Sequence, residues 1–268
     1  MQKKEIKYSF SIGYRCNSVQ FLRRYNMSKF SGPFDWMYID IDSAIQNIID
    51  KFEFYLKDIV IINKSETLLK LLYPSKKVDI NKDILDFFGQ DPIYMKHDYK
   101  NQLLPINQNF TEAKSNDIYN WDKICIFLHH ILDDDSDLNK IKKRISIFNE
   151  VSSNYYESTL LFYISKIINR NDIKKEVKRL TDLYLKLDKK YQFVSILCCA
   201  YAEDIHYKFE NFLFIIKNVP DYNKQYEVYE TDNNFEWLDY GMIGINYDKE
   251  YDIIKKYYDF NLVEKEDV

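Results

Sequence analysis

Glycine and proline are scarce in this chain, since each occurs only five times in 268 residues. The few glycines form neither the GxGxxG pattern nor the GxxxxGK pattern followed by Ser or Thr, in which backbone N–H groups approach the phosphates of a nucleotide. The sequence therefore gives no reason to expect a bound nucleotide. We expect no other cofactor either.

An excess of positive charge and a long apolar run are also missing. The formal net charge of −4 argues against a nucleic-acid partner, because phosphate contacts need a basic face. No segment approaches the roughly 18 uninterrupted apolar residues that span a bilayer. The N-terminus runs into a strand-like stretch without the apolar core of a signal peptide. We expect a cytoplasmic protein without a membrane span.

The cysteines show no spacing typical of a metal site. Cys16, Cys125, Cys198 and Cys199 form no CxxC or Cys/His pattern, so we expect thiols rather than structural zinc or disulfides. The acidic run at 133–137 lacks the glycine and the closing glutamate of a calcium loop. We therefore interpret it as a solvated turn and expect no metal.

The second half of the chain carries the strongest structural pattern. Ser158–Ile168 and Tyr191–Cys198 are nearly continuous apolar runs of strand length, separated by a charged amphipathic segment at Asp172–Leu187. This is a βαβ pattern, which implies two parallel strands joined by a right-handed crossover. Other expected strands are Ile6–Ile12 and Phe212–Ile216, and an apolar piece lies within Trp121–Ile131. Helices are expected at Ser18–Tyr25, at Leu138–Val151, at Lys249–Tyr258, and from an N-cap at Asp42-Ser43 through Ile49.

These elements predict the α/β class. We expect residues 1–268 to form a single three-layer domain with a mostly parallel central sheet, since no repeat, linker or break in composition divides the chain. The irregular stretch Phe52–Asn120 allows no firm assignment.

Cys16 is the candidate nucleophile. It follows Gly13 by three residues, where the first strand should give way to a helix. The N–H groups and the dipole of a helix N-terminus stabilise a thiolate, and the neighbouring Arg15 adds positive charge. The same N–H groups can serve as an oxyanion hole. The alternative is that Cys16 is a small buried hydrophobic residue.

Four histidines are the only candidates for a base: His97, His129, His130 and His206. His97 is preferred because it lies in the turn-rich middle section, a setting typical of functional loops. His129 and His130 end an apolar run, where either could cap a helix. His206 is typical of surface or core packing. A structural role for each of them stays open.

Asp35 lies between two aromatic residues, Phe34 and Trp36, which we expect to pack. A carboxylate in a partly apolar place must be hydrogen-bonded, which would suit an orienting partner for an imidazole. The alternative is that Asp35 only caps backbone N–H groups of the turn after Pro33. We expect the turn Pro33–Trp36 to lie beside Cys16.

The motifs SIGYRC (Ser11–Cys16) and SGPFDW (Ser31–Trp36), followed by MKHD (Met95–Asp98), KKRISIF and TLLFYIS, resemble the bacterial DUF1796 family of papain-like cysteine peptidases. The resemblance implies a Cys nucleophile, a His base and an Asp or Asn that orients the His. Cys16 and His97 match the first two, and Asp35 or Asp98 would orient the imidazole. It also implies a papain-like α+β fold as the alternative to the α/β prediction.

Two functions follow as hypotheses. In the first, the chain is a cysteine-nucleophile hydrolase or acyl transferase that acts on a peptide, amide or ester, with Cys16 attacking a carbonyl and His97 moving the proton. In the second, it is a non-catalytic or glycan-biosynthesis-associated α/β module, in which Cys16 and the PFDW turn are structural. Fast alkylation of Cys16 would favour the first.

Overall fold

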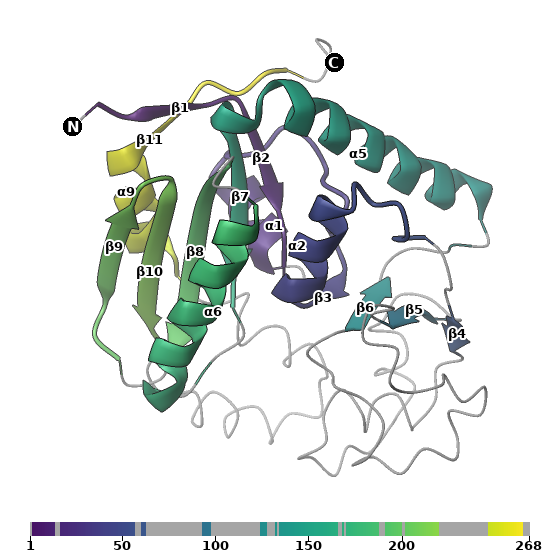
Figure 1. Cartoon of the computed structure of the whole chain (residues 1–268). Helices are drawn as coiled ribbons and strands as arrows, with labels where there is room; N and C mark the ends of the chain where they lie inside the picture. Colours follow the sequence, from purple (N-terminus) through teal and green to yellow (C-terminus); the bar gives the residue numbers. More distant parts are fainter. Residues whose placement is uncertain are drawn as a thin grey trace.

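A parallel sheet forms the centre of the computed structural model (Figure 1). The structure describes residues 2–13, 17–56, 60–62, 93–97, 124–127, 132, 134–165, 168, 170–187, 191–199, 202–219 and 246–264, and of residues 38, 60–62, 93–97 and 124–127 it describes the backbone alone. The strand order is β2-β7-β8-β10-β9. The strands are β2 (Tyr8–Ser11), β7 (Thr159–Ile164), β8 (Gln192–Cys199), β9 (Ile205–Phe209) and β10 (Phe212–Asn218).

The predicted βαβ unit is present. β7 and β8 are adjacent and parallel, with Leu161 opposite Phe193, and α6 (Ile173–Lys186) connects them. β2 pairs with β7 and β10 with β8, both in parallel, and only β9 is antiparallel. This confirms the α/β class with a mostly parallel sheet, rather than the α+β alternative. That the whole chain is one domain stays a prediction.

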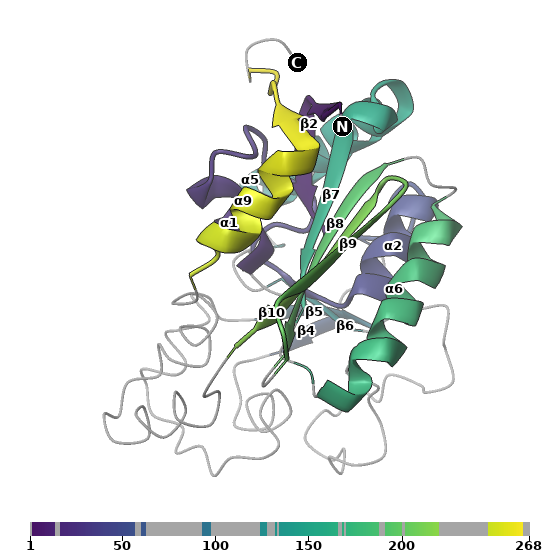
Figure 2. The same cartoon turned by 90° about the vertical axis from the view of Figure 1, so that its left-hand side faces the viewer.

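Helices cover both faces of the sheet (Figure 2). α2 (Ile41–Ile49) and α6 lie on one face, and α1 (Asn17–Arg24) and α9 (Asp248–Tyr257) lie on the other. Alternate residues of β7 enter two core clusters, Leu161 and Tyr163 on the α6 side and Leu160 and Phe162 on the α1 side. Because both faces are buried, the strand reads as an unbroken apolar run.

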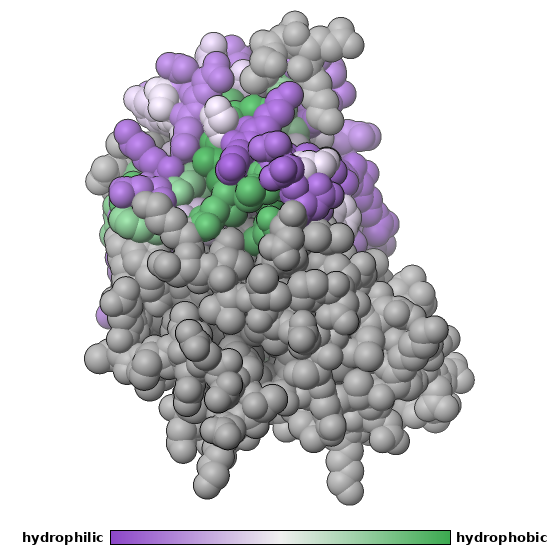
Figure 3. Space-filling model, turned by 90° about the vertical axis from the view of Figure 1, so that its right-hand side faces the viewer, coloured by the Kyte–Doolittle hydropathy of each residue, from purple (hydrophilic) through white to green (hydrophobic). Residues whose placement is uncertain are grey.

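α5 (Asp135–Asn154) is long and mostly hydrophilic, with Ile141, Phe148 and Val151 as its buried contacts to the core. Asp134 caps the helix by accepting a hydrogen bond from the N–H of Ser136 at 2.8 Å. Figure 3 shows the side of the molecule that lies at the right of Figure 1. Hydrophobic residues gather in one area of this side, with hydrophilic residues above and beside them.

Several strands were not predicted or were predicted differently. The predicted strand Ile6–Ile12 is interrupted at Lys7, so that β2 begins at Tyr8. Ile6 instead ends β1 (Lys4–Ile6), which pairs with β11 (Tyr258–Phe260). A second, antiparallel sheet has the order β3-β6-β5-β4. Its strands are β3 (Tyr38–Ile39), β4 (Val60–Ile62), β5 (Ile93–His97) and β6 (Ile124–Phe127).

The predicted start of α2 was also wrong. Asp40, rather than Asp42 or Ser43, is its N-cap, and its side chain accepts a hydrogen bond from the N–H of Ser43. The extended backbone of Asp40 satisfies the geometry of an N-cap.

Candidate functional site

The candidate site lies where the first parallel strand ends. The carboxyl ends of parallel strands meet at one edge of a sheet, and open α/β sheets usually bind their ligands there. The N–H of Ile12 still donates to Phe162 O at 2.9 Å, so pairing with β7 continues just past β2. α1 begins at Asn17. Cys16, which immediately precedes it, lies outside the described residues.

Gly13 is required where the chain leaves β2, because a neighbouring ring leaves no room for a side chain. A Cβ atom at position 13 would lie 2.5 Å from Cδ2 and 2.7 Å from Cε2 of Tyr163. Tyr163 is a buried residue of β7. The Tyr163 ring therefore packs closely against the backbone of Gly13, where the chain leaves β2.

Ser18 fixes the first turn of α1 to the sheet. Its Oγ accepts a hydrogen bond from the N–H of Ile164, the last residue of β7, at 2.9 Å, and Ser18 is fully buried. The adjacent Asn17 is also buried, and its Nδ2 has no hydrogen-bond partner among the residues that the structure describes. Both polar residues were missed from sequence. The available signal was that Ser18 lies two residues after the candidate cysteine, at the start of the predicted helix Ser18–Tyr25.

Asp35 connects its turn to the carboxyl end of β2. Its Oδ1 accepts a hydrogen bond from the hydroxyl of Ser11 at 3.1 Å, and its Oδ2 accepts one from the N–H of Gly32 at 3.0 Å. The residue is 2% exposed. The expected hydrogen bonding of this carboxylate is therefore confirmed. The bond to Ser11 shows that Asp35 does more than cap its own turn.

Opposing effects act on the Asp35 carboxyl group. Burial raises its pKa to about 6, while hydrogen bonds from Gly32 and Ser11 and the positive charges of Arg144 and Arg23 lower it. Burial dominates because it disfavours the charged form. Asp35 therefore gains or loses its proton at a mildly acidic pH.

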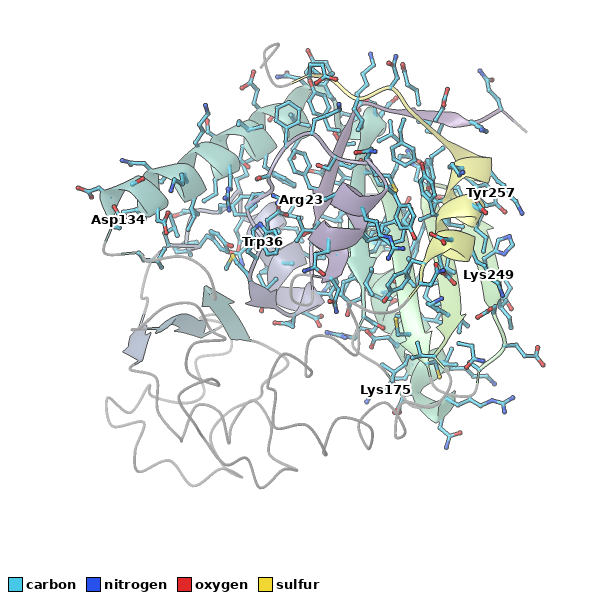
Figure 4. All side chains as sticks on the ribbon, turned by 180° about the vertical axis from the view of Figure 1, so that it is seen from behind. Arg23, Trp36, Asp134, Lys175, Lys249 and Tyr257 are labelled. Atoms are coloured by element: carbon cyan, nitrogen blue, oxygen red, sulfur yellow. The ribbon has the colours of Figure 1, made fainter. Side chains whose placement is uncertain are left out.

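The two aromatic residues beside Asp35 differ in their surroundings. Phe34 is buried, with its ring centroid 5.3 Å from that of Phe52. Trp36 is only partly buried and has a positive φ of 64°, an unusual conformation for a bulky residue. The guanidinium carbon of Arg23 lies 4.9 Å from the centroid of the Trp36 ring, and Figure 4 labels both residues. The expectation of two packed aromatics thus holds for Phe34, whereas Trp36 carries a cation on its ring.

The histidines fall in different parts of the fold. His97 is the last residue of strand β5, where it pairs with Ile124, so its expected loop setting was wrong. His206 lies in β9, four strands from β2 in the sheet order, which corresponds to about 19 Å. That separation removes His206 as a base for a nucleophile that follows β2. His129, His130 and Asp98 lie outside the described residues.

Two other cysteines are buried thiols. Cys198 and Cys199 end β8. Burial raises the pKa of Cys198 to about 12, which makes this thiol unreactive at neutral pH.

The described residues contain no group of three or more His, Cys, Asp or Glu that could hold a metal ion. Among them, no helix has the length and apolar character needed to cross a membrane.

The fold and these contacts define an α/β protein with a candidate site at the carboxyl end of its first parallel strand. Residues 7–198 match the family described as "Putative papain-like cysteine peptidase (DUF1796)", and the chain belongs to that family. No curated protein and no solved structure matches the chain. The matched range ends within β8, so β9, β10, α9 and β11 lie beyond it.

Proposed function

We propose that this chain is a cysteine-nucleophile hydrolase or acyl transferase in which Cys16 attacks the carbonyl of a peptide, amide or ester. The observation that carries the proposal is the start of α1 at Asn17, since the residue before a helix is close to its unpaired N–H groups. The family description supports the same chemistry.

In the proposed reaction, His97 takes the thiol proton of Cys16 and the thiolate attacks the carbonyl carbon. Backbone N–H groups at the start of α1 stabilise the oxyanion. The imidazolium then gives its proton to the leaving amine or alcohol as a thioester forms. Water, or a second acceptor in a transferase, cleaves the thioester and restores the thiol.

Asp35 belongs to the proposed site through its hydrogen bond to Ser11, which terminates β2. This contact supports a role in holding the strand from which the Cys16 loop departs. Asp98, directly after His97 in the chain, is the other carboxylate expected from the sequence to orient the imidazole.

We also propose that the protein works in a reducing compartment such as the bacterial cytoplasm. Cys198 and Cys199 are buried, adjacent in β8 and free of disulfides. Such thiols persist where glutathione and thioredoxin keep cysteines reduced.

The rate of iodoacetamide labelling at Cys16, followed by peptide mass spectrometry from pH 4 to 9, tests the proposed function. A thiolate stabilised by an imidazolium should label well below pH 8.5, the usual pKa of a thiol. His97→Ala should remove this low-pH component, and the matched variant His206→Ala should retain it.

Labelling of His97→Ala at the parent rate throughout this pH range would reject the cysteine-histidine mechanism. Cys16 would then be a structural thiol, and the non-catalytic α/β module would be the better account of the chain.

A further inference from the structure

β9 forms one edge of the parallel sheet. Among the described residues it pairs only with β10, and it is the outermost strand of this sheet in Figures 1 and 2. Tyr207 and Phe209 lie on the same face of β9, because side chains two residues apart in a strand point the same way. They are 60% and 52% exposed. An edge strand with exposed aromatic side chains is a template for pairing with another chain.

The outer edge of β9 presents backbone groups that β10 does not use. The two strands are joined by the two-residue turn Glu210-Asn211, with Phe209 opposite Phe212. In such a hairpin the pair next to the turn exchanges hydrogen bonds, and the direction of the N–H and C=O groups alternates along the strand. Phe209 and every second residue before it therefore bond to β10. His206 and Lys208 direct their N–H and C=O groups away from it.

Two oppositely charged side chains on this edge have no ion-pair partner among the described residues. Asp204, just before β9, accepts a hydrogen bond from the N–H of Asn218 at 2.7 Å. Lys208 donates a hydrogen bond to the backbone O of Glu210. Burial and the nearby positive charge of Lys4 lower the pKa of Lys208 to about 8. A carboxylate beside Lys208 would be stabilising, because opposite charge favours the ionised form.

Asp204 and Lys208 lie two residues before and two residues after His206. When a second copy pairs with β9 in antiparallel orientation about a two-fold axis at His206, Asp204 of each copy lies opposite Lys208 of the other. The same register places Ile205 of each copy opposite Tyr207 of the other. Ile205 already packs against the hydrophobic core, so the exposed Tyr207 would extend that core across the axis.

Charge selects this register over its neighbours. An axis at Tyr207 would place Asp204 opposite Glu210, and an axis at Lys208 would place two lysines opposite each other. Like charges directly opposite each other destabilise a pair of strands. An axis between two residues would bring side chains from different faces of the sheet into one row. The axis at His206 is the one that joins each unpaired charge to its opposite.

We propose that β9 is the interface of a homodimer, in which two copies pair these edge strands in antiparallel orientation about His206 and form one continuous sheet. The occupant is a second copy of this chain because the edge is complementary to itself in both charge and apolar contacts. Pairing of five-residue strands buries less than the roughly 1,600 Å² of a standard interface. We therefore expect a dissociation constant in the micromolar range. This inference is independent of the proposed function.

Sedimentation velocity of the full chain at pH 7, from about 1 to 300 µM, tests the proposal. We expect the sedimentation coefficient to rise from the monomer towards the dimer with concentration. Asp204→Lys and Lys208→Asp should each weaken the dimer by at least about tenfold, because each places two like-charged pairs across the axis. The double variant Asp204→Lys/Lys208→Asp restores opposite charges and should recover the parent affinity.

His206→Pro tests the backbone pairing separately. It removes an N–H that points away from β10, a position where an edge strand tolerates proline, and should abolish the dimer. Glu150→Lys is the matched charge control, because this exposed residue belongs to α5, far from β9 in Figure 1, and should not change the affinity. Circular dichroism checks that each variant is folded. If His206→Pro unfolds, the charge variants still decide the outcome.

A parent that stays monomeric over the whole range would overturn the proposal and leave the β9 edge to a different partner. A double charge variant that binds no tighter than the single variants would overturn it as well, as would a folded His206→Pro protein that dimerises like the parent.

Discussion

Replacing Glu250 with glutamine should destabilise the protein strongly, because it breaks a buried ion pair. Lys217 Nζ lies 3.0 Å from both Oε1 and Oε2 of Glu250. The side chains are 11% and 2% exposed, respectively. Glu250 is in the first turn of α9 and Lys217 is near the end of β10, so the pair fastens that helix to the sheet.

The expected cost comes mainly from the lysine that stays behind. Removing one partner of a buried pair typically costs about 3–5 kcal/mol, since the other charge is left uncompensated. Lys217 keeps some access to water and also lies 5.2 Å from the centroid of the Tyr247 ring. We therefore expect the lower end, about 3 kcal/mol. In a chain of this size that corresponds to a fall in thermal midpoint of roughly 6–12 °C.

Thermal unfolding followed by circular dichroism at pH 7 measures this effect. Asp252→Asn is the matched control, since its pair with Lys255 is exposed on the same helix, and it should not change the midpoint measurably. The double variant Lys217→Met/Glu250→Leu should recover most of the loss, because an apolar pair removes the uncompensated charge. Equal midpoints for Glu250→Gln and Asp252→Asn would refute the reasoning.

Further predictions concern the candidate site. Gly13→Ala should cost about 1–3 kcal/mol in urea unfolding through its clash with Tyr163, and a compensating Tyr163→Leu should reduce that cost; additive losses would contradict the clash. Ser18→Ala should cost a similar amount by leaving the N–H of Ile164 unpaired, whereas Ser18→Thr, which keeps the acceptor, should cost less. Because the pKa of Asp35 is raised to about 6, its contribution to stability is fully present below about pH 4 and is lost as the pH rises through 6. The difference in free energy of unfolding between the parent and Asp35→Asn should therefore change by up to about 3 kcal/mol between pH 4 and 7, and a difference that does not vary with pH would contradict the raised pKa.

The parallel sheet could be predicted because burial on both faces leaves a strong local pattern. β7 and β8 are apolar along their length, and α6 between them is amphipathic, so short segments sufficed. The antiparallel sheet was not predicted. β3 has only two residues and β4 only three, which is too short for alternation to be recognised.

The site could be predicted only where its determinants are close in sequence. The hydrogen-bonded state of Asp35 followed from its two aromatic neighbours. The bond between Ser18 and Ile164 joins residues 146 positions apart, and Lys217 and Glu250 are 33 apart. Such pairs are set by tertiary packing, so no local pattern marks them. The N-cap was misassigned by two residues because Asp40 and Asp42 are both good capping residues.

The most direct test of the central claim is to trap the acyl group on the proposed nucleophile. The protein should be mixed with excess p-nitrophenyl acetate, quenched in acid and mapped by peptide mass spectrometry. A catalytic Cys16 attacks the ester carbonyl and displaces p-nitrophenolate, which leaves an acetyl thioester on Cys16. We predict a burst of p-nitrophenolate, an acetylated Cys16 peptide, and loss of both in Cys16→Ala and His97→Ala. An unmodified Cys16 in the parent, or the same acetylation of Cys16 in His97→Ala, would contradict the account.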